Sequence, residues 1–152
     1  MQVFRLSREA FALPLSGKGA ALKGARWNSP GIEMIYTAEN RSLAMAEVAV
    51  HLTWATMPKD FVMLTIEIPE NVSRTVLEPN LLPPNWKNFP HNTATQKLGD
   101  QFILENNHCL MFVPSVITPG EFNVLINPNH GDFTEIKLVK SEPFPLDSRL
   151  VR

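Results

Sequence analysis

The feature that most constrains this chain is an apolar segment, residues 43–55, that carries a single carboxylate. Its only other polar side chains are those of His51 and Thr53. A helix that is apolar nearly all round is normally buried, so we expect this one to pack against a sheet. It should end before Pro58, because proline cannot continue a helix.

The carboxylate belongs to Glu47, which shares one helical stripe with apolar residues. Leu43, Val50 and Trp54 would lie on its face, because positions i, i+4, i+7 and i+11 coincide on a helix. A carboxylate among apolar neighbours is costly to ionise unless a cation pairs with it, and Arg26, in a glycine-bounded loop, is the nearest candidate. Two interpretations remain open: a structural ion pair or rim carboxylate, or a site for an anionic substrate and a cationic transition state.

Composition restricts the class of protein and its partners. The chain has 152 residues, of which 44% are hydrophobic and 19% charged, and this predicts one ordered domain over residues 1–152. A net charge of -1 without a basic stripe disfavours direct binding to nucleic acid. The single cysteine, Cys109, cannot form an internal disulfide, which fits a reducing compartment. We expect a cytoplasmic protein with no membrane contact, because no signal peptide or run of roughly 18 apolar residues is visible.

Strands are predicted wherever apolar residues alternate with polar ones or form short bounded runs. These segments are residues 3–6, 33–37, 61–68, 73–77, 110–113, 122–126 and 133–139. The segments at 110–113 and 122–126 would suit antiparallel neighbours. A second helix is predicted over residues 93–106, capped by Thr93, although Gly99 costs it about 1 kcal/mol relative to alanine.

The remaining segments lack a hydrophobic period. Residues 13–31, 79–92 and 143–152 are predicted to be irregular, and Trp86 and Phe89 should pack the second of them onto the body of the protein. The elements then run as strands, a buried helix, strands, a helix and strands. This order indicates an α+β fold, because a parallel sheet would need strands and helices that alternate regularly.

Metal and thiol chemistry are disfavoured by spacing. No two of the four histidines form an H-x-x-x-H pair, and the E-x-x-x-H of Glu47 and His51 has no third ligand nearby. His108 and Cys109 are adjacent, which does not resemble a zinc pattern. We therefore expect no metal. Cys109 precedes a core strand, where most cysteines are small buried apolar groups and not nucleophiles.

Three polar residues at the ends of strands are candidates for a ligand site. Ser115 could face a cleft or bond a local turn, and no G-x-S-x-G elbow marks it as a hydrolase nucleophile. Asn127 could border the same cleft, although a simple turn is the favoured interpretation. Tyr36, the only tyrosine, would either be a core residue with a hydrogen-bonded hydroxyl or stack on a ligand ring.

Six short motifs occur along the chain in a distinctive order. They are G-A-R-W-N at 24–28, Y-T-A at 36–38, A-E at 46–47, L-P-x-N-W at 82–86, V-P-S at 113–115 followed by P-G-E at 119–121, and N-P-x-H at 127–130. In this order they resemble the RES-domain proteins, the toxin halves of Xre–RES toxin–antitoxin modules. The resemblance covers nearly the whole chain. It places the name-giving arginine, glutamate and serine at Arg26, Glu47 and Ser115, with the family's site tyrosine at Tyr36.

The resemblance implies a fold, a substrate and an activity. The fold would be like that of ADP-ribosyltransferases: α+β, with a mixed or antiparallel split sheet and flanking helices. The substrate would be NAD+, with no metal. The enzyme would cleave the nicotinamide–ribose bond by hydrolysis or phosphorolysis, as a glycohydrolase or phosphorylase, and would arrest growth by depleting NAD+.

The resemblance also implies roles for the candidate residues. Glu47 would stabilise an oxocarbenium-like species and hold the ribose 2′-hydroxyl. Arg26 would grip the diphosphate or its adjoining ribose, and Tyr36 would stack on nicotinamide. Ser115 would hydrogen-bond the ribose or orient Glu47. Asn127, at the border of the cleft, is a further candidate for binding NAD+.

Partners and alternatives follow from the same resemblance. The implied partner is an Xre-type helix-turn-helix antitoxin that blocks the active site and itself binds DNA. One alternative is an ADP-ribosyltransferase that modifies a cellular protein and differs only in its acceptor. We favour NAD+ degradation, because no target-recognition loop is recognisable. Another alternative is a non-catalytic binding module acting through a partner, and the presence of Arg26 and Glu47 counts against it.

Overall fold

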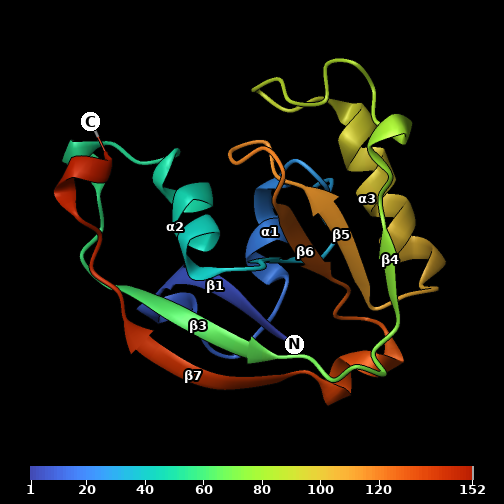
Figure 1. The fold of residues 1–152 in the computed structure, drawn as a ribbon, viewed down its shortest axis with the longest axis horizontal. Coiled ribbons are helices and arrows are strands. Elements are labelled where there is room, and N and C mark those ends of the chain that lie inside the picture. Colours follow the sequence, from blue (N-terminus) through green and yellow to red (C-terminus); the bar gives the residue numbers. More distant parts are fainter. Residues whose placement is uncertain (152) are drawn as a thin grey trace.

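The structure, a computed structural model, describes residues 1–151 and combines one sheet with helices on its faces (Figure 1). The strands are β1 (Gln2–Arg8), β2 (Ile35–Ala38), β3 (Phe61–Glu67), β4 (Arg74–Val76), β5 (Leu110–Pro114), β6 (Phe122–Ile126) and β7 (Lys137–Pro143). The α-helices are α1 (Lys18–Lys23), α2 (Arg41–Ala49) and α3 (Thr93–Glu105). Across residues 1–151, every helix is too short or too polar to traverse a lipid bilayer.

The sheet consists of two halves joined at one point. Its strand order is β4-β5-β6-β2-β1-β3-β7, and every neighbouring pair is antiparallel except β4 with β5. At the middle of the sheet, β1 and β2 pair only at Phe4 and Ala38. Beyond that contact the half-sheets β4-β5-β6-β2 and β1-β3-β7 diverge. The predicted α+β fold with a split sheet and flanking helices is therefore confirmed.

The two half-sheets share an inner core, and each carries a helix on its other face. The inner core combines apolar side chains from both halves, among them Val3, Ile35, Leu64, Leu110, Val124 and Ile126. On the outer face of the first half, α3 packs Phe102 and Ile103 against Met111 and Leu125. On the second half, α2 packs Leu43 and Ala44 against Leu6 and Met63 (Figure 1). Helix α2 also packs on Ala38 of β2, so it lies beside the point where the two half-sheets meet.

The apolar helix is shorter and less buried than its composition predicts. It ends at Ala49, and the chain then turns through 3₁₀-type bonds into a short turn that begins at Trp54. A reciprocal pair of bonds between Thr53 and Thr56 caps that turn and competes with continuation of the helix. Val50 and Trp54 are consequently 54% and 63% exposed, so the predicted stripe does not extend to residue 55.

The segments at the two ends of the chain also differ from prediction. Helix α1 lies within residues 13–31, which lack a helical period in the sequence. The final strand is shifted toward the C-terminus, because residues 131–135 form a 3₁₀ turn whose first amides bond to His130. After that strand, Val151 is buried, so the end of the described chain packs on the protein.

Helix α3 fixes the loop that contains Arg26. An added Cβ on Gly99 would lie 1.6 Å from the Trp27 carbonyl oxygen, so the glycine permits a contact that no other residue allows. Asp100 accepts hydrogen bonds from the Ser29 amide and hydroxyl. The cap of the helix is Asn92, whose side chain accepts two backbone N–H bonds, and not the predicted Thr93. The helix therefore acts as a rigid support for one wall of the cavity described next.

Candidate active site

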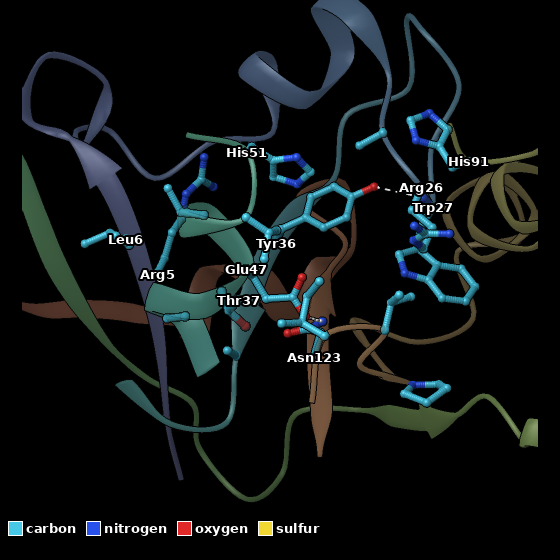
Figure 2. Close-up of a pocket in the computed structure, with 18 of the residues that line it drawn as sticks. Arg5, Leu6, Arg26, Trp27, Tyr36, Thr37, Glu47, His51, His91 and Asn123 are labelled. Atoms are coloured by element: carbon cyan, nitrogen blue, oxygen red, sulfur yellow. Dashed lines mark hydrogen bonds between the residues drawn. The ribbon is translucent and has the colours of Figure 1, made fainter. Parts of the chain in front are cut away.

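A cavity of about 730 Å³ opens where β1 and β2 diverge (Figure 2). Its walls come from both strands, from α2 and from the loops at 24–27, 87–91 and 114–117. One carboxylate and five basic side chains line it: Glu47, with Arg5, Arg26, Lys87, His51 and His91. On a chain with a net charge of -1, this concentration of basic groups indicates a site for an anionic ligand.

Glu47 is anchored through one of its two carboxylate oxygens. Its Oε1 accepts a hydrogen bond of 2.8 Å from the Ser115 hydroxyl and one of 2.7 Å from the Asn123 amide. Its Oε2 accepts none from the residues that the structure describes. One oxygen therefore holds the carboxylate in position, and the other remains available to a ligand in the cavity.

Ser115 supports Glu47 and has no capacity left for a ligand. Its hydroxyl donates to Glu47 and accepts bonds of 3.0 Å from the Ile117 and Thr118 amides, which uses its donor and both lone pairs. The side chain is 3% exposed and does not line the cavity. Of the two expected roles, the geometry favours orienting Glu47 over a bond to the ribose.

Arg26 lines the same cavity as Glu47 but does not pair with it in residues 1–151. Its Nη1 donates to the Trp86 carbonyl at 2.5 Å and to the Asn88 carbonyl at 3.2 Å. Burial lowers the pKa of the guanidinium, and the nearby charge of Glu47 partly opposes that effect. Arg26 therefore ties the 79–92 loop to the cavity wall, and the structural ion pair that the sequence left open as one interpretation is not formed within residues 1–151.

Tyr36 lies on β2 with its ring against the cavity and its hydroxyl held by the neighbouring loop. The hydroxyl donates to Asn28 Oδ1 at 2.6 Å and accepts from the Trp27 amide at 3.1 Å (Figure 2). Burial raises the pKa of Tyr36 well above its usual value, so the phenol stays neutral. The ring can therefore offer an apolar face to a ligand while its polar end is satisfied.

An aromatic contact joins His51, in the turn that follows α2, to the 79–92 loop at the cavity. The Phe89 ring lies 5.9 Å from the His51 ring and 6.5 Å from the His91 ring, measured between centroids. Burial lowers the pKa of His91, and Arg26 and His51 lower it further. Trp86 packs on Trp27 and is partly buried, but Phe89 is 72% exposed, so only one of the two predicted anchors packs into the body of the protein.

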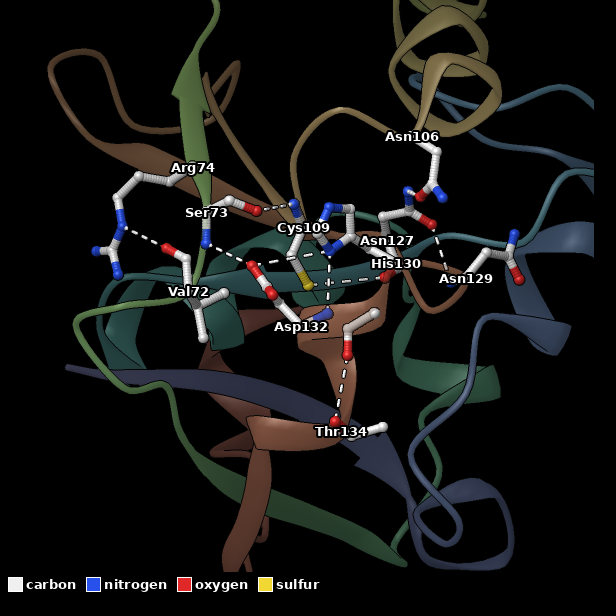
Figure 3. Close-up of polar contacts among 11 residues, drawn as sticks. Val72, Ser73, Arg74, Asn106, Cys109, Asn127, Asn129, His130, Asp132 and Thr134 are labelled. Atoms are coloured by element: carbon white, nitrogen blue, oxygen red, sulfur yellow. Dashed lines mark hydrogen bonds and ion pairs between the residues drawn. The ribbon is translucent and has the colours of Figure 1, made fainter.

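Asn127, the predicted candidate for binding NAD+ at the border of the cleft, does not line this cavity. It is fully buried, donates to Asn106 Oδ1 at 2.8 Å and accepts from the Asn129 amide at 2.9 Å (Figure 3). Its side chain therefore shapes the turn after β6, as the simpler interpretation of the sequence proposed. His130 and Asp132 lie in the same polar cluster.

Two residues of the cavity, Arg5 and Asn123, are missing from the prediction. Each is a polar side chain inside a strand that is otherwise apolar, in V-F-R-L and F-N-V-L-I. Such an interruption is the signal that could have identified them. Among residues 1–151, no cluster of three or more His, Cys, Asp or Glu side chains is placed to hold a metal ion.

Residues 2–147 match the family described as the RES domain, which is nearly the whole chain. The chain belongs to the RES family. A protein of Sphingobium sp. (strain YBL2) described as Prs ADP-ribosylating toxin is 39% identical over 140 residues, covering 91% of this chain and 87% of the relative. A protein of Photorhabdus laumondii subsp. laumondii called Toxin Res is 38% identical and covers 100% of this chain and 98% of the relative.

The fold also matches a solved toxin. One chain in the crystal structure of the M. tuberculosis MbcT–MbcA toxin–antitoxin complex superposes with a TM-score of 0.76, covering 98% of this chain and 85% of that chain. The two sequences are 20% identical, so the match concerns the fold alone.

Proposed function

We propose that this chain is the toxin of a toxin–antitoxin module and that it cleaves the nicotinamide–ribose bond of NAD+. The observation that carries the proposal is the state of Glu47: one oxygen is fixed by two donors and the other is free in a cavity rich in cations. A dinucleotide with a diphosphate suits such a cavity in both charge and size. The names of the RES relatives, Toxin Res and Prs ADP-ribosylating toxin, support the same function.

The chemistry follows from charge. Loss of nicotinamide leaves positive charge on the ribose, in an oxocarbenium-like transition state. A carboxylate held in place before the reaction stabilises that charge without reorganising. The free Oε2 of Glu47 would accept the ribose 2′-hydroxyl, and Ser115 and Asn123 would act as positioning residues by holding Oε1.

Two further side chains would hold the substrate. The ring of Tyr36 would stack on nicotinamide, since its hydroxyl is already bonded within the protein. Arg26 would contact the dinucleotide with the donors that the Trp86 and Asn88 carbonyls leave free. Because the proposed substrate is a soluble dinucleotide, we place the reaction in the cytoplasm.

A second candidate differs only in the acceptor. The name of the Sphingobium relative favours transfer of ADP-ribose to a protein, with Glu47 in the same role. Water or phosphate as acceptor remains our first proposal. A non-catalytic module would have no use for a carboxylate fixed by one oxygen beside a cavity.

The proposed partner is an antitoxin of the Xre type that covers the cavity and carries the DNA-binding function. The MbcT–MbcA structure is itself a toxin–antitoxin complex, which supports a protein partner. Phe89, which lines the cavity, is 72% exposed, and exposed aromatic side chains are common at interfaces.

The deciding experiment measures loss of NAD+ by the purified chain, with and without phosphate, and separates the products by chromatography. Nicotinamide with ADP-ribose indicates hydrolysis, and a phosphate-dependent product indicates phosphorolysis. Glu47→Gln is the control. Absence of NAD+ loss from the folded chain in both buffers would overturn degradation and favour transfer to a protein. An equally active Glu47→Gln variant would remove Glu47 from the mechanism.

A further inference from the structure

Arg5 places a guanidinium in the cavity on the side formed by β1. It follows Phe4, the one residue through which β1 pairs with β2, so it lies where the two half-sheets begin to separate. Arg5 lines the cavity together with its neighbours Phe4 and Leu6 (Figure 2). Its backbone is held in register with Leu64 of β3, so this cation is carried by a strand in the middle of the sheet.

This guanidinium is nearly without partners in the part of the chain that the structure describes. Its one hydrogen bond runs from Nη1 to the Ser16 carbonyl at 3.5 Å, and within residues 1–151 it forms no ion pair. Burial alone lowers its pKa, with no nearby carboxylate to oppose the effect. Within residues 1–151, every fully buried side-chain nitrogen has a hydrogen-bond partner. The guanidinium nitrogens of Arg5 that form no hydrogen bond are therefore accessible to solvent or to a ligand.

Two other arginines, Arg26 and Arg8, differ from Arg5 in this respect. Arg26 donates hydrogen bonds from one of its guanidinium nitrogens to carbonyls of the 79–92 loop. Arg8, three residues further along β1, forms an ion pair with Asp60 on the surface. Arg5 combines burial with a largely unused fork, and a fork of five donors matches the oxygens of a phosphate. A half-buried guanidinium without a carboxylate is costly unless an anion binds beside it.

We propose that Arg5 forms a phosphate-binding subsite of the cavity, separate from Arg26. This inference rests on the proposed function for its biological meaning, but the subsite itself does not depend on catalysis. The ligand is a phosphate group, which has two possible sources: the diphosphate of the bound dinucleotide, or free inorganic phosphate that serves as the acceptor.

The first test is binding of inorganic pyrophosphate to the purified chain, measured by calorimetry at low salt. We expect Arg5→Met to weaken binding by about tenfold or more, as the loss of a charged hydrogen bond does. Arg8→Gln is the matched control: it removes the same charge from the same strand, outside the cavity, and should leave binding almost unchanged. Wild-type binding retained in a folded Arg5→Met variant would overturn the proposal, and so would equal losses in the two variants.

A second measurement keeps the test valid if Arg5→Met does not fold. In the wild-type chain, the nuclear magnetic resonance signal of the Arg5 Nε–H group should shift as pyrophosphate is added, while that of Arg8 should not. An unmoved Arg5 signal at saturating pyrophosphate would overturn the subsite.

The source of the phosphate is separated by kinetics on Arg5→Lys, which keeps the charge and loses the fork. A raised KM for NAD+ with unchanged phosphate dependence assigns the subsite to the diphosphate. A raised requirement for phosphate with unchanged KM for NAD+ assigns it to the acceptor. Unchanged values of both would contradict the proposal. Pyrophosphate binding at Arg5 in a chain that never consumes NAD+ would support the subsite and overturn the proposed function.

Discussion

Glu47 and Asp132 are two carboxylates that each depend on a serine, but they use it in different ways. Glu47 takes its bond from the Ser115 hydroxyl and keeps its second oxygen free in a cavity. Asp132 takes its bond from the Ser73 backbone amide at 2.9 Å and lies 3.8 Å from His130 (Figure 3). The first arrangement presents a carboxylate, and the second uses one to tie a turn to a strand.

The neighbours of the two clusters extend the difference. Around Glu47 stand several cations that could hold an anionic ligand. Near Asp132 lies Cys109, a buried thiol whose pKa is raised to about 12 by burial, and to a lesser degree by Asp132. A thiol of that kind remains protonated and unreactive near neutral pH. Similar residue types therefore form a candidate site in one place and a structural cluster in the other, depending on unused bonding capacity and an adjacent cavity.

The largest effect should come from Glu47→Gln. This substitution keeps the volume and the bond from Ser115 but removes the negative charge that would face the ribose. We expect loss of NAD+ cleavage by on the order of 10² to 10³ in kcat, in line with removal of one preorganised electrostatic group. The thermal midpoint should change little. The matched variant Asp132→Asn, assayed beside it, should keep the wild-type kcat. A comparable loss of kcat in Asp132→Asn would contradict the view that only the Glu47 carboxylate acts in the reaction.

The two serines give the next test. Ser115→Ala leaves Glu47 and two backbone amides without their partner, so kcat should fall by roughly tenfold or more, with a smaller change in KM. Ser73→Ala removes the bond that its hydroxyl accepts from the Cys109 amide, and with it the smaller contribution of that hydroxyl to lowering the pKa of Asp132. It should lower stability by about 1 kcal/mol and leave kcat unchanged. Steady-state kinetics with thermal unfolding would show whether the two effects separate in this way.

Much of the fold could be predicted from the sequence, because residues that are buried on one face of a strand or helix recur at regular spacing along the chain. Residues 61–68 and 122–126 alternate or form bounded apolar runs, and both are strands. The errors lie where local bonds override that period, as at Thr53, whose capping box ends the apolar helix early, and at His130, whose ring caps a 3₁₀ turn. These competing bonds depend on side-chain geometry that a hydrophobic pattern does not contain.

The candidate site was predicted in part. Arg26, Tyr36 and Glu47 do line one cavity, and Ser115 touches it through Glu47. Of the two interpretations that the sequence left open for Glu47, the structural ion pair with Arg26 is not formed in residues 1–151, because the Arg26 guanidinium donates to loop carbonyls instead. Whether Ser115 or any other side chain has spare donors is a property of three-dimensional neighbours, and adjacent positions in the sequence do not reveal it.

Two asparagines, Asn127 in the polar cluster around Asp132 and Asn123 beside Glu47, give a further comparison of the two sites. Asn127→Ala would remove the hydrogen bonds that a fully buried side chain forms with Asn106 and with the Asn129 amide, at a cost of about 1 kcal/mol in unfolding free energy, because Asn106 and Asn129 are exposed and can bond to water instead. Its activity at a temperature where the variant is folded should equal that of the wild type. Asn123→Ala should instead lower kcat by severalfold, because Glu47 loses one of its two anchors. Denaturant unfolding would measure the stability of each variant, and initial rates would measure its activity. A larger loss of activity in Asn127→Ala than in Asn123→Ala would contradict this expectation.

The smallest expected effect concerns pH and stability. The bond from the Ser73 backbone amide, more than any other cause, holds the pKa of Asp132 below its usual value. A carboxylate whose pKa is lower in the folded state stabilises the fold above the pKa of the unfolded chain, and this contribution disappears as pH falls through the folded pKa. Asp132→Asn should therefore be less stable than the wild type at neutral pH, with the gap narrowing toward strongly acidic pH. Because the group is exposed, the gap should be modest, and a gap that is constant from neutral to acidic pH would assign the effect to packing and not to charge.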